Sequence, residues 1–230
     1  STGGRNVITN SRIFGHTQNG VWMAAADRTN FVFGNDISSN NQAGILVSDV
    51  NGDGNVISKN TFRGLGYQDN GVTVIDADAN VVTNNLFTGM TVAGVNFSAS
   101  ATSNRVVGNT IRSNQSYGIR LNGSDADMNN ITANTINGRR VQDYGIYLNG
   151  ADGNIIANNT IFGHTNASFN SAGIFFDTGS DSNRVVGNPV YSNYDAGAWF
   201  NGTVRANVFV GNSLDGRGGQ GRGMYISGSY

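Results

Sequence analysis

The stretch from Asn104 to Leu121 reads Asn-Arg-Val-Val-Gly-Asn-Thr-Ile-Arg-Ser-Asn-Gln-Ser-Tyr-Gly-Ile-Arg-Leu, and the chain repeats this pattern nine times. An aliphatic residue (Phe209 in the last repeat) stands two positions after the first Asn, a second Asn (Ser11 in the first repeat) five after it, and a large apolar residue seven after it. A loop and a Gly-apolar-x-apolar segment complete the repeat. The first Asn recurs in steps of 24 or 25 residues, with one step of 29, at Asn6, Asn30, Asn55, Asn80, Asn104, Asn129, Asn154, Asn183 and Asn207. Such a period is typical of a solenoid.

Each repeat contains three short segments with the period-two spacing of strands that bury one face. Three strands per repeat make one coil, or rung, of a parallel β-helix, and rungs stack about 4.8 Å apart. Nine rungs then form a rod of roughly 40 Å. The chain has no Glu and a single Lys, so helix-forming residues are scarce. The sequence therefore predicts an all-β fold: a single-stranded parallel β-helix of about nine rungs of three short strands.

The two columns of Asn have a structural explanation. The second Asn lies between two apolar pairs only four residues apart, so we expect it at a tight corner, where Asn tolerates the left-handed conformation. Its side-chain amide can also bond to the same Asn one rung away, which makes an Asn ladder. Asn109 and Asn134 should therefore be buried and hydrogen-bonded.

This arrangement resembles the right-handed parallel β-helix of the pectate-lyase-like superfamily, including its Asn ladder at the short second turn. That superfamily includes polysaccharide lyases, polygalacturonase-type hydrolases, mannuronan C5-epimerases and phage tailspikes. The resemblance covers the whole chain and implies a polysaccharide groove on the outer face of the Gly-apolar-x-apolar strands. The chain lacks the Asp-Pro-His segment of the epimerases and the Asp-Asp pair of the polygalacturonases, so the resemblance implies no particular reaction.

Composition limits the partners. The continuous repeats predict one domain over residues 1–230, and the chain has a net charge of −1, no Cys and no apolar run of membrane-spanning length. Nucleic acid is not an expected partner without a basic surface. Abundant Asn, Ser, Thr and Gly with almost no Lys are typical of extracellular proteins or of cell and virion surfaces.

A ligand is expected where the loops vary. The loop before the Gly strand has six, eight or eleven residues, and it is longest in repeat 7. Beside it, the outward residues of the Gly strands include four consecutive aromatics. Aromatic rings suit sugars, although stacking within the sheet or a partner chain covering the strip would explain them equally. The predicted carbohydrate-binding residues are Tyr117, Tyr147, Phe175, Trp199, Tyr225, Asn122 and Asn149.

Catalysis on the same face has two alternatives. Enzymes that act on uronic acids need a cation for the carboxylate and a base, which predicts Arg120 with Tyr144 or Tyr147, and His164 in the longest loop as a further candidate. A pair formed by Asp143 and Asp177 would instead suit a glycosidase. The enzyme class would be polysaccharide lyase, C5-epimerase or glycoside hydrolase.

A weak calcium motif is the one sign of a cofactor. Asp49, Asn51 and Asp53 match the first half of an EF-hand-type loop, with Gly at the sixth position. The twelfth position, which is a bidentate Glu in an EF-hand, is Asn60 of the ladder. The alternative is therefore an ordinary turn without a metal.

The sequence starts within the first rung and stops soon after the last Gly strand, and no capping helix is predicted at either end. The chain is then either part of a longer one or a subunit that stacks end to end in a homo-oligomer, which would cover Val208, Leu214, Met224 and Ile226. Two functions follow: a β-helix that binds and processes an acidic polysaccharide, or a structural solenoid that mediates self-assembly without catalysis.

Overall fold

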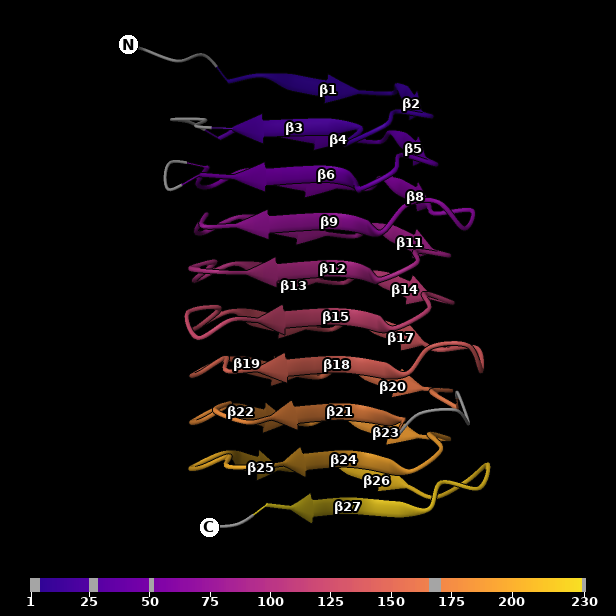
Figure 1. The fold of residues 1–230 in the computed structure, drawn as a ribbon, viewed down its shortest axis with the longest axis vertical. Coiled ribbons are helices and arrows are strands. Elements are labelled where there is room, and N and C mark those ends of the chain that lie inside the picture. Colours follow the sequence, from indigo (N-terminus) through magenta and orange to yellow (C-terminus); the bar gives the residue numbers. More distant parts are fainter. Residues whose placement is uncertain (1–4, 25–28, 50–51, 166–170, 229–230) are drawn as a thin grey trace.

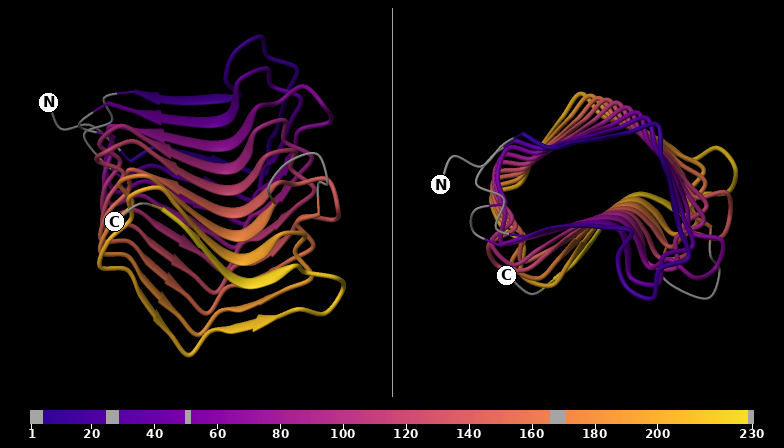
Figure 2. Two further views of the ribbon diagram at one scale, coloured as in Figure 1. Left: turned by 60° about the horizontal axis from the view of Figure 1, so that its bottom comes forward. Right: turned by 90° about the horizontal axis from the view of Figure 1, so that it is seen from above.

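The computed structural model describes residues 5–24, 29–49, 52–165 and 171–228, and in these ranges the chain forms 27 strands and no helix. The strands stack into a rod, with the first strand, β1 Val7–Thr9, at one end and the last, β27 Arg222–Ser227, at the other (Figure 1). Each rung gives one strand to each of three parallel sheets, A, B and C, of nine strands each. Seen along the rod, the sheets enclose an elongated cross-section (Figure 2). The β-helix prediction is confirmed.

Sheets A and B consist of three-residue strands joined by the tight corner. Sheet A contains β1 Val7–Thr9, β4 Phe31–Phe33, β7 Val56–Ser58, β10 Val81–Thr83, β13 Arg105–Val107, β16 Asn130–Thr132, β19 Ile155–Ala157, β22 Arg184–Val186 and β25 Val208–Val210. Sheet B contains β2 Arg12–Phe14, β5 Asp36–Ser38, β8 Thr61–Arg63, β11 Leu86–Thr88, β14 Thr110–Arg112, β17 Thr135–Asn137, β20 Thr160–Phe162, β23 Pro189–Tyr191 and β26 Ser213–Asp215.

Sheet C is built from the Gly-apolar-x-apolar segments, and most of its strands have six residues. It contains β3 Val21–Ala24, β6 Ala43–Ser48, β9 Asn70–Ile75, β12 Ala93–Ser98, β15 Tyr117–Asn122, β18 Tyr144–Asn149, β21 Ala172–Asp177, β24 Ala196–Asn201 and β27 Arg222–Ser227. Equivalent positions of successive repeats pair with one another, as Ile119 does with Ile146. The repeat in the sequence therefore sets the register of the sheets.

The inward residues of the three sheets form one continuous apolar core. Like residues stack on like, and the rings of Phe62 and Phe87 lie 4.6 Å apart, centroid to centroid. At the C-terminal end of the stack, Val208, Met224 and Ile226 are exposed and Leu214 is half-buried. End-to-end assembly through these residues stays a prediction.

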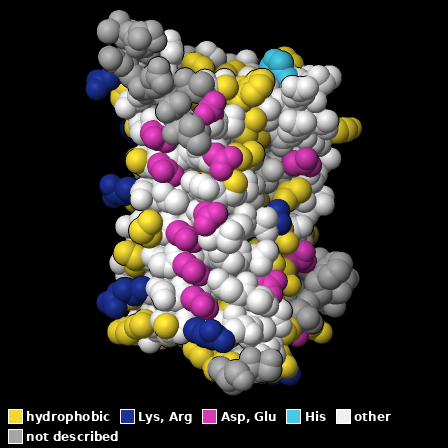
Figure 3. Space-filling view, turned by 60° about the vertical axis from the view of Figure 1, so that its left-hand side comes forward, with side chains coloured by type: hydrophobic (Ala, Val, Ile, Leu, Met, Phe, Trp, Pro, Cys, Tyr) yellow, Lys and Arg dark blue, Asp and Glu magenta, His cyan; other side chains and the backbone are white. Residues whose placement is uncertain are grey.

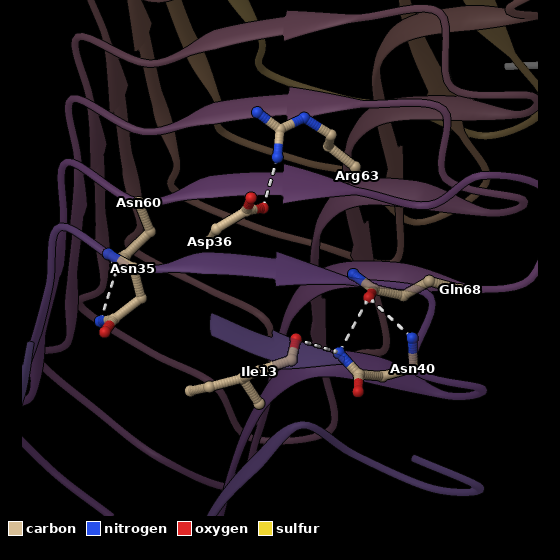
Figure 4. A network of polar contacts seen from close by, with 7 residues as sticks. All are labelled: Ile13, Asn35, Asp36, Asn40, Asn60, Arg63 and Gln68. Carbon is tan, nitrogen blue, oxygen red and sulfur yellow. Dashed lines mark hydrogen bonds and ion pairs between the residues drawn. The ribbon is translucent and has the colours of Figure 1, made fainter. Parts of the chain in front are cut away.

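The Asn ladder at the corner between sheets A and B is confirmed. Asn109 and Asn134 are each 1% exposed. The backbone N and the Nδ2 of Asn109 both donate to Oδ1 of Asn134, at 2.9 and 3.0 Å. The same link joins Asn35 to Asn60 near the N-terminal end (Figure 4). A second ladder of the same kind runs down the corner between sheets C and A, where Asn55 bonds to Asn80.

The expected left-handed conformation does not belong to the ladder Asn. It belongs to the residue directly before it, such as Gly108 at φ 67° and Ala133 at φ 55°. The preceding residue makes the turn, and the ladder Asn can therefore keep an ordinary conformation that points its side chain inward. The conformational reason given for these Asn residues is thus wrong, while their hydrogen-bonding role holds.

A third polar column, missed by the sequence patterns, fills the inside of the corner between sheets B and C. Asn40 is one member, and its backbone N and Nδ2 donate to Oε1 of Gln68 in the next rung (Figure 4). Most loops of six residues supply Asn, one of them supplies the apolar Met90, and loops of eight residues supply Gln, which reaches further. The members are Asn40, Gln68, Met90, Asn114, Gln142, His164, Asn193 and Gln220.

Candidate functional site

The outer face of sheet C carries the predicted aromatic residues in register. Tyr147 pairs with Phe175, Phe175 with Trp199, and Trp199 with Tyr225 on successive rungs. They pack as a cluster that is separate from the core. The strand phase is therefore correct, and we call this cluster the aromatic strip: Tyr117, Tyr144, Tyr147, Phe175, Trp199 and Tyr225.

The rings of the strip pack mainly against one another. Phe175 lies 4.8 Å from Tyr144 and 5.4 Å from Trp199, measured between ring centroids. As a result, Phe175 is only 6% exposed and Trp199 only 8%. The open ring faces that the sequence suggested are therefore confined to the half-buried tyrosines.

An arginine flanks the strip at each end. The guanidinium carbon of Arg120 lies 5.1 Å from the ring centroid of Tyr117, and that of Arg222 lies 4.4 Å from that of Tyr225. Arg120 is half-buried, and its Nε is buried without a hydrogen-bond partner in the described part of the chain. A buried donor of this kind favours an acceptor supplied by a ligand or by water.

Beside the strip, Asp177 collects three hydrogen bonds. The Tyr147 hydroxyl donates to its Oδ2 at 2.7 Å, and Asn201 Nδ2 and the Thr178 backbone N donate to its Oδ1 at 3.0 and 2.9 Å. In the same row, Nδ2 of Asn149 donates to Oδ1 of Asn122 at 3.1 Å. The structure thus brings Asn122, Asn149 and Asp177 into one polar row along the strip.

The two candidate tyrosine bases both keep their protons. Burial raises the pKa of Tyr144 to about 12, and the charge of Asp143 adds to this shift. Burial also raises the pKa of Tyr147, with a further contribution from its hydrogen bond to Asp177. Both phenols are therefore hydrogen-bond donors at neutral pH, and this protonation argues against either as a general base.

The Asp143–Asp177 pair predicted for a glycosidase is wrong. Asp143 directly precedes β18 and Asp177 ends β21, and the register aligns Tyr144 with Ala172 and Asn149 with Asp177. Six positions along a strand separate the two residues, which is about 20 Å at the rise of a parallel strand. Glycosidase carboxylates stand only about 5–9.5 Å apart.

The prediction that His164 is catalytic is also wrong. His164 is completely buried in the third polar column, and its backbone N donates to Oδ1 of Asn193 at 3.3 Å. Burial lowers the pKa of its imidazole to about 3. A side chain enclosed in the rod cannot contact a substrate on the outer face.

The burial of His164 makes stability depend on pH. The unfolded chain protonates this imidazole below its ordinary pKa of 6.5, whereas the folded chain keeps it neutral down to about pH 3. Unfolding therefore becomes easier as the pH falls through this window, by at most about 1.4 kcal/mol per pH unit. We expect His164→Asn, which copies Asn114 and Asn193 of the same column, to remove this part of the slope. Urea denaturation of both proteins at pH 7, 5.5 and 4.5 measures how the free energy of unfolding depends on pH. If it falls equally with pH in both proteins, His164 is not the cause.

The calcium motif lies at the corner between sheets C and A. Asn51 lies outside the described residues, while Asp49 and Asp53 are exposed. Oδ1 of Asp53 accepts a hydrogen bond from the backbone N of Asp78 at 2.7 Å, which is a structural use of its carboxylate. No group of three or more His, Cys, Asp or Glu residues suited to a metal occurs among the residues described. Calcium binding stays a prediction.

Asp53 is the first of a column of Asp residues at the corner between sheets C and A. The sequence patterns did not predict this column, because its members looked like ordinary turn residues. In most rungs of the corner, an Asp side chain accepts a hydrogen bond from the backbone N of the equivalent residue one rung further on. Figure 3 shows acidic side chains in a line along this edge of the rod. The acceptors are Asp53, Asp78, Asp127, Asp152 and Asp181.

The chain matches the family described as the right handed beta helix region over residues 1–111 and 93–230, which together span it. It therefore belongs to that family, and the predicted handedness holds. No curated protein matches the sequence.

Several solved structures share the fold at low sequence identity. The enzymatically active domain of tailspike protein 2 from bacteriophage CBA120 is 14% identical, with a TM-score of 0.73 over 98% of this chain and 38% of its own. The periplasmic alginate epimerase AlgG is 14% identical, with a TM-score of 0.62 over 88% of this chain and 51% of its own. XylC, in a complex with xylose, is 10% identical, with a TM-score of 0.61 over 81% of this chain and 35% of its own. The chain thus spans about half or less of the length of these proteins.

The part of the chain that the structure describes contains no helix with the length and apolar character needed to cross a membrane.

Proposed function

We propose that this chain binds an acidic polysaccharide along the outer face of sheet C, from β15 to β27. The observation that carries the proposal is the aromatic strip, which runs in register over five rungs between Arg120 and Arg222. Four rung steps span roughly 19 Å at strand spacing. An extended surface of this length suits a linear polymer better than a small metabolite.

The chemistry of the face suits a sugar that carries a carboxylate. Half-buried Tyr117, Tyr144 and Tyr147 offer apolar ring surface, and the phenols of Tyr144 and Tyr147 keep their protons, which together match the mixed surface of a sugar ring. The amides of Asn122 and Asn149 add hydrogen-bonding groups beside them. The guanidinium of half-buried Arg120, beside the ring of Tyr117, supplies the positive charge for the carboxylate.

The same face offers a reduced set of groups for processing the polymer. With both tyrosines protonated and the Asp143–Asp177 pair too far apart, Asp177 is the remaining candidate proton acceptor, beside Tyr147 as a donor. Arg120 would neutralise the uronate. Lyase or epimerase chemistry through these three residues is part of the proposal, secondary to binding.

The similar structures support this function through what their names state. AlgG is an alginate epimerase of the periplasm, the bacteriophage protein is a tailspike, and XylC was solved with xylose. The same fold thus occurs in a periplasmic enzyme named for a polysaccharide and in a protein solved with a sugar. We accordingly propose an extracellular, cell-surface or virion-surface location for this chain.

Two arginines of the same rung make a matched test. Arg120 lies on the outer face of sheet C, and Arg105 is exposed on the outer face of sheet A. We expect Arg120→Gln to weaken binding of oligogalacturonate or oligomannuronate about tenfold or more, the value of one charge-assisted hydrogen bond. Arg105→Gln should leave binding within about twofold. Isothermal titration calorimetry at low salt measures both. Equal losses would indicate a nonspecific charge effect and reject the site.

A further inference from the structure

A concave site, separate from the aromatic strip, lies outside the corner between sheets B and C. Its lining comes from four rungs: Arg140 from rung 6, Gly163 and Thr165 from rung 7, Ser192 and Tyr194 from rung 8, and Gly218 from rung 9. The loops that join β17 to β18 and β26 to β27 project from this edge (Figure 1), and both belong to the repeats with eight residues between the apolar residue of sheet B and the Gly of sheet C. The pocket lies between these two loops, and no residue of the aromatic strip lines it.

The lining of this pocket combines a cation, hydroxyls and an aromatic ring. Tyr194 is 47% exposed, and its ring has no aromatic neighbour among the described residues, in contrast to the rings of the strip. Arg140 is exposed and has no ion-pair partner in the described ranges. Both side chains are therefore available to a ligand, with the hydroxyls of Thr165 and Ser192 beside them.

The backbone at Arg140 supplies an independent observation. Arg140 has a φ of 68°, in the left-handed region that side chains other than those of Gly, Asn and Asp seldom adopt. The equivalent residues of the other two eight-residue loops are Gly66 and Gly218, at φ 81° and 77°. The chain thus keeps an arginine where its own repeats use glycine. Among the three loops of this length, the arginine occurs only in one that lines the pocket.

We propose that this pocket binds a carboxylate-bearing sugar residue. Arg140 pairs with the carboxylate, Thr165 and Ser192 bond to sugar hydroxyls, and the ring of Tyr194 packs against the pyranose. The inference rests on the proposed function and extends it by one subsite. β24 begins two residues after Tyr194, and Tyr117 and Tyr144 of the strip stand at the equivalent starts of β15 and β18, so the pocket adjoins the edge of the strip and one polysaccharide bound along the rod can contact both.

The test uses two neighbouring arginines. Arg139 has the same left-handed strain, at φ 47°, but does not line the pocket. We expect Arg140→Gly to weaken binding of oligogalacturonate about tenfold, while its melting temperature stays the same or rises. Arg139→Gly removes the same charge from the adjacent residue and should bind within about twofold of wild type. Tyr194→Thr, which copies Thr165 of the preceding rung, should weaken binding of both oligogalacturonate and its carboxyl-reduced neutral form.

The outcomes separate this pocket from the strip. A loss in Arg140→Gly for the acidic oligosaccharide but not for the neutral form supports the pocket. Binding that Arg120→Gln weakens and Arg140→Gly leaves unchanged overturns the pocket and preserves the proposed function. Equal losses in Arg139→Gly and Arg140→Gly show a general charge effect and overturn the pocket. If the wild type binds no acidic oligosaccharide, both proposals fail.

Discussion

Replacing Gly145 with Ala will destabilise the protein by about 3 kcal/mol or more, at the upper end of the effects of overpacking a core. A Cβ at this position would lie 2.4 Å from the carbonyl oxygen of Gly173 and 2.5 Å from Cγ2 of Ile161. The obstacle is backbone of the next rung, so it cannot move without breaking the register of sheet C. The same close approach to the next rung recurs at the equivalent glycines, such as Gly118 and Gly173, and explains why this position of sheet C is Gly.

Gly153→Ala is the matched control for this clash. Gly153 has a φ of 63°, but a Cβ there would meet nothing closer than Cγ of Met128 at 3.7 Å. Ala79 and Ala206 already occupy the same corner position in other rungs, at φ 56° and 55°. The control should lose only about 1 kcal/mol, the cost of left-handed backbone. Urea denaturation measures both variants, and equal losses would show that contact between rungs does not require glycine at position 145.

Asn134→Ala will cost about 2–4 kcal/mol, because several buried groups lose a partner at once. Oδ1 of Asn134 accepts from the backbone N and Nδ2 of Asn109, and its Nδ2 donates to the carbonyl of Val106 at 2.8 Å and to Oδ1 of Asn159 at 2.9 Å. The loss should appear as a lower urea midpoint in a cooperative unfolding transition.

An Asn at the same corner provides the control for this ladder. Asn158 is exposed and left-handed at φ 56°, and Ala133 holds the equivalent position one rung earlier. Asn158→Ala should therefore change stability by less than about 0.5 kcal/mol, as surface substitutions usually do. If Asn134→Ala proved equally mild, the ladder would contribute little to stability.

The architecture could be predicted because each repeat has to stack on the next. Residues that pair across rungs, such as Ile119 and Ile146, recur at fixed positions in the sequence. The polar column at the corner between sheets B and C was missed because its members change with loop length, from Asn114 to Gln142 to His164. Counting backward from the Gly of sheet C, Asn stands four residues before it and Gln three, and this offset would have found the column.

The candidate site was predicted in position but not in environment. Period two placed Phe175 and Trp199 on the outer face, yet it could not show that their rings would bury one another. His164 was expected in the exposed part of the longest loop. It instead belongs to the buried start of that loop, at a position that other rungs also have. The left-handed backbone of Arg140 has no signature in a single repeat, although its alignment with Gly66 and Gly218 gives one.

A crystal structure of the chain with a bound acidic oligosaccharide tests the central claim most directly. We expect the sugar to lie along the rod over β15, β18, β21 and β24, with a carboxylate at Arg120 and hydroxyls near Tyr147 and Asn149. An oligosaccharide bound only to the outer faces of sheets A or B, with the aromatic strip unoccupied, would contradict the account.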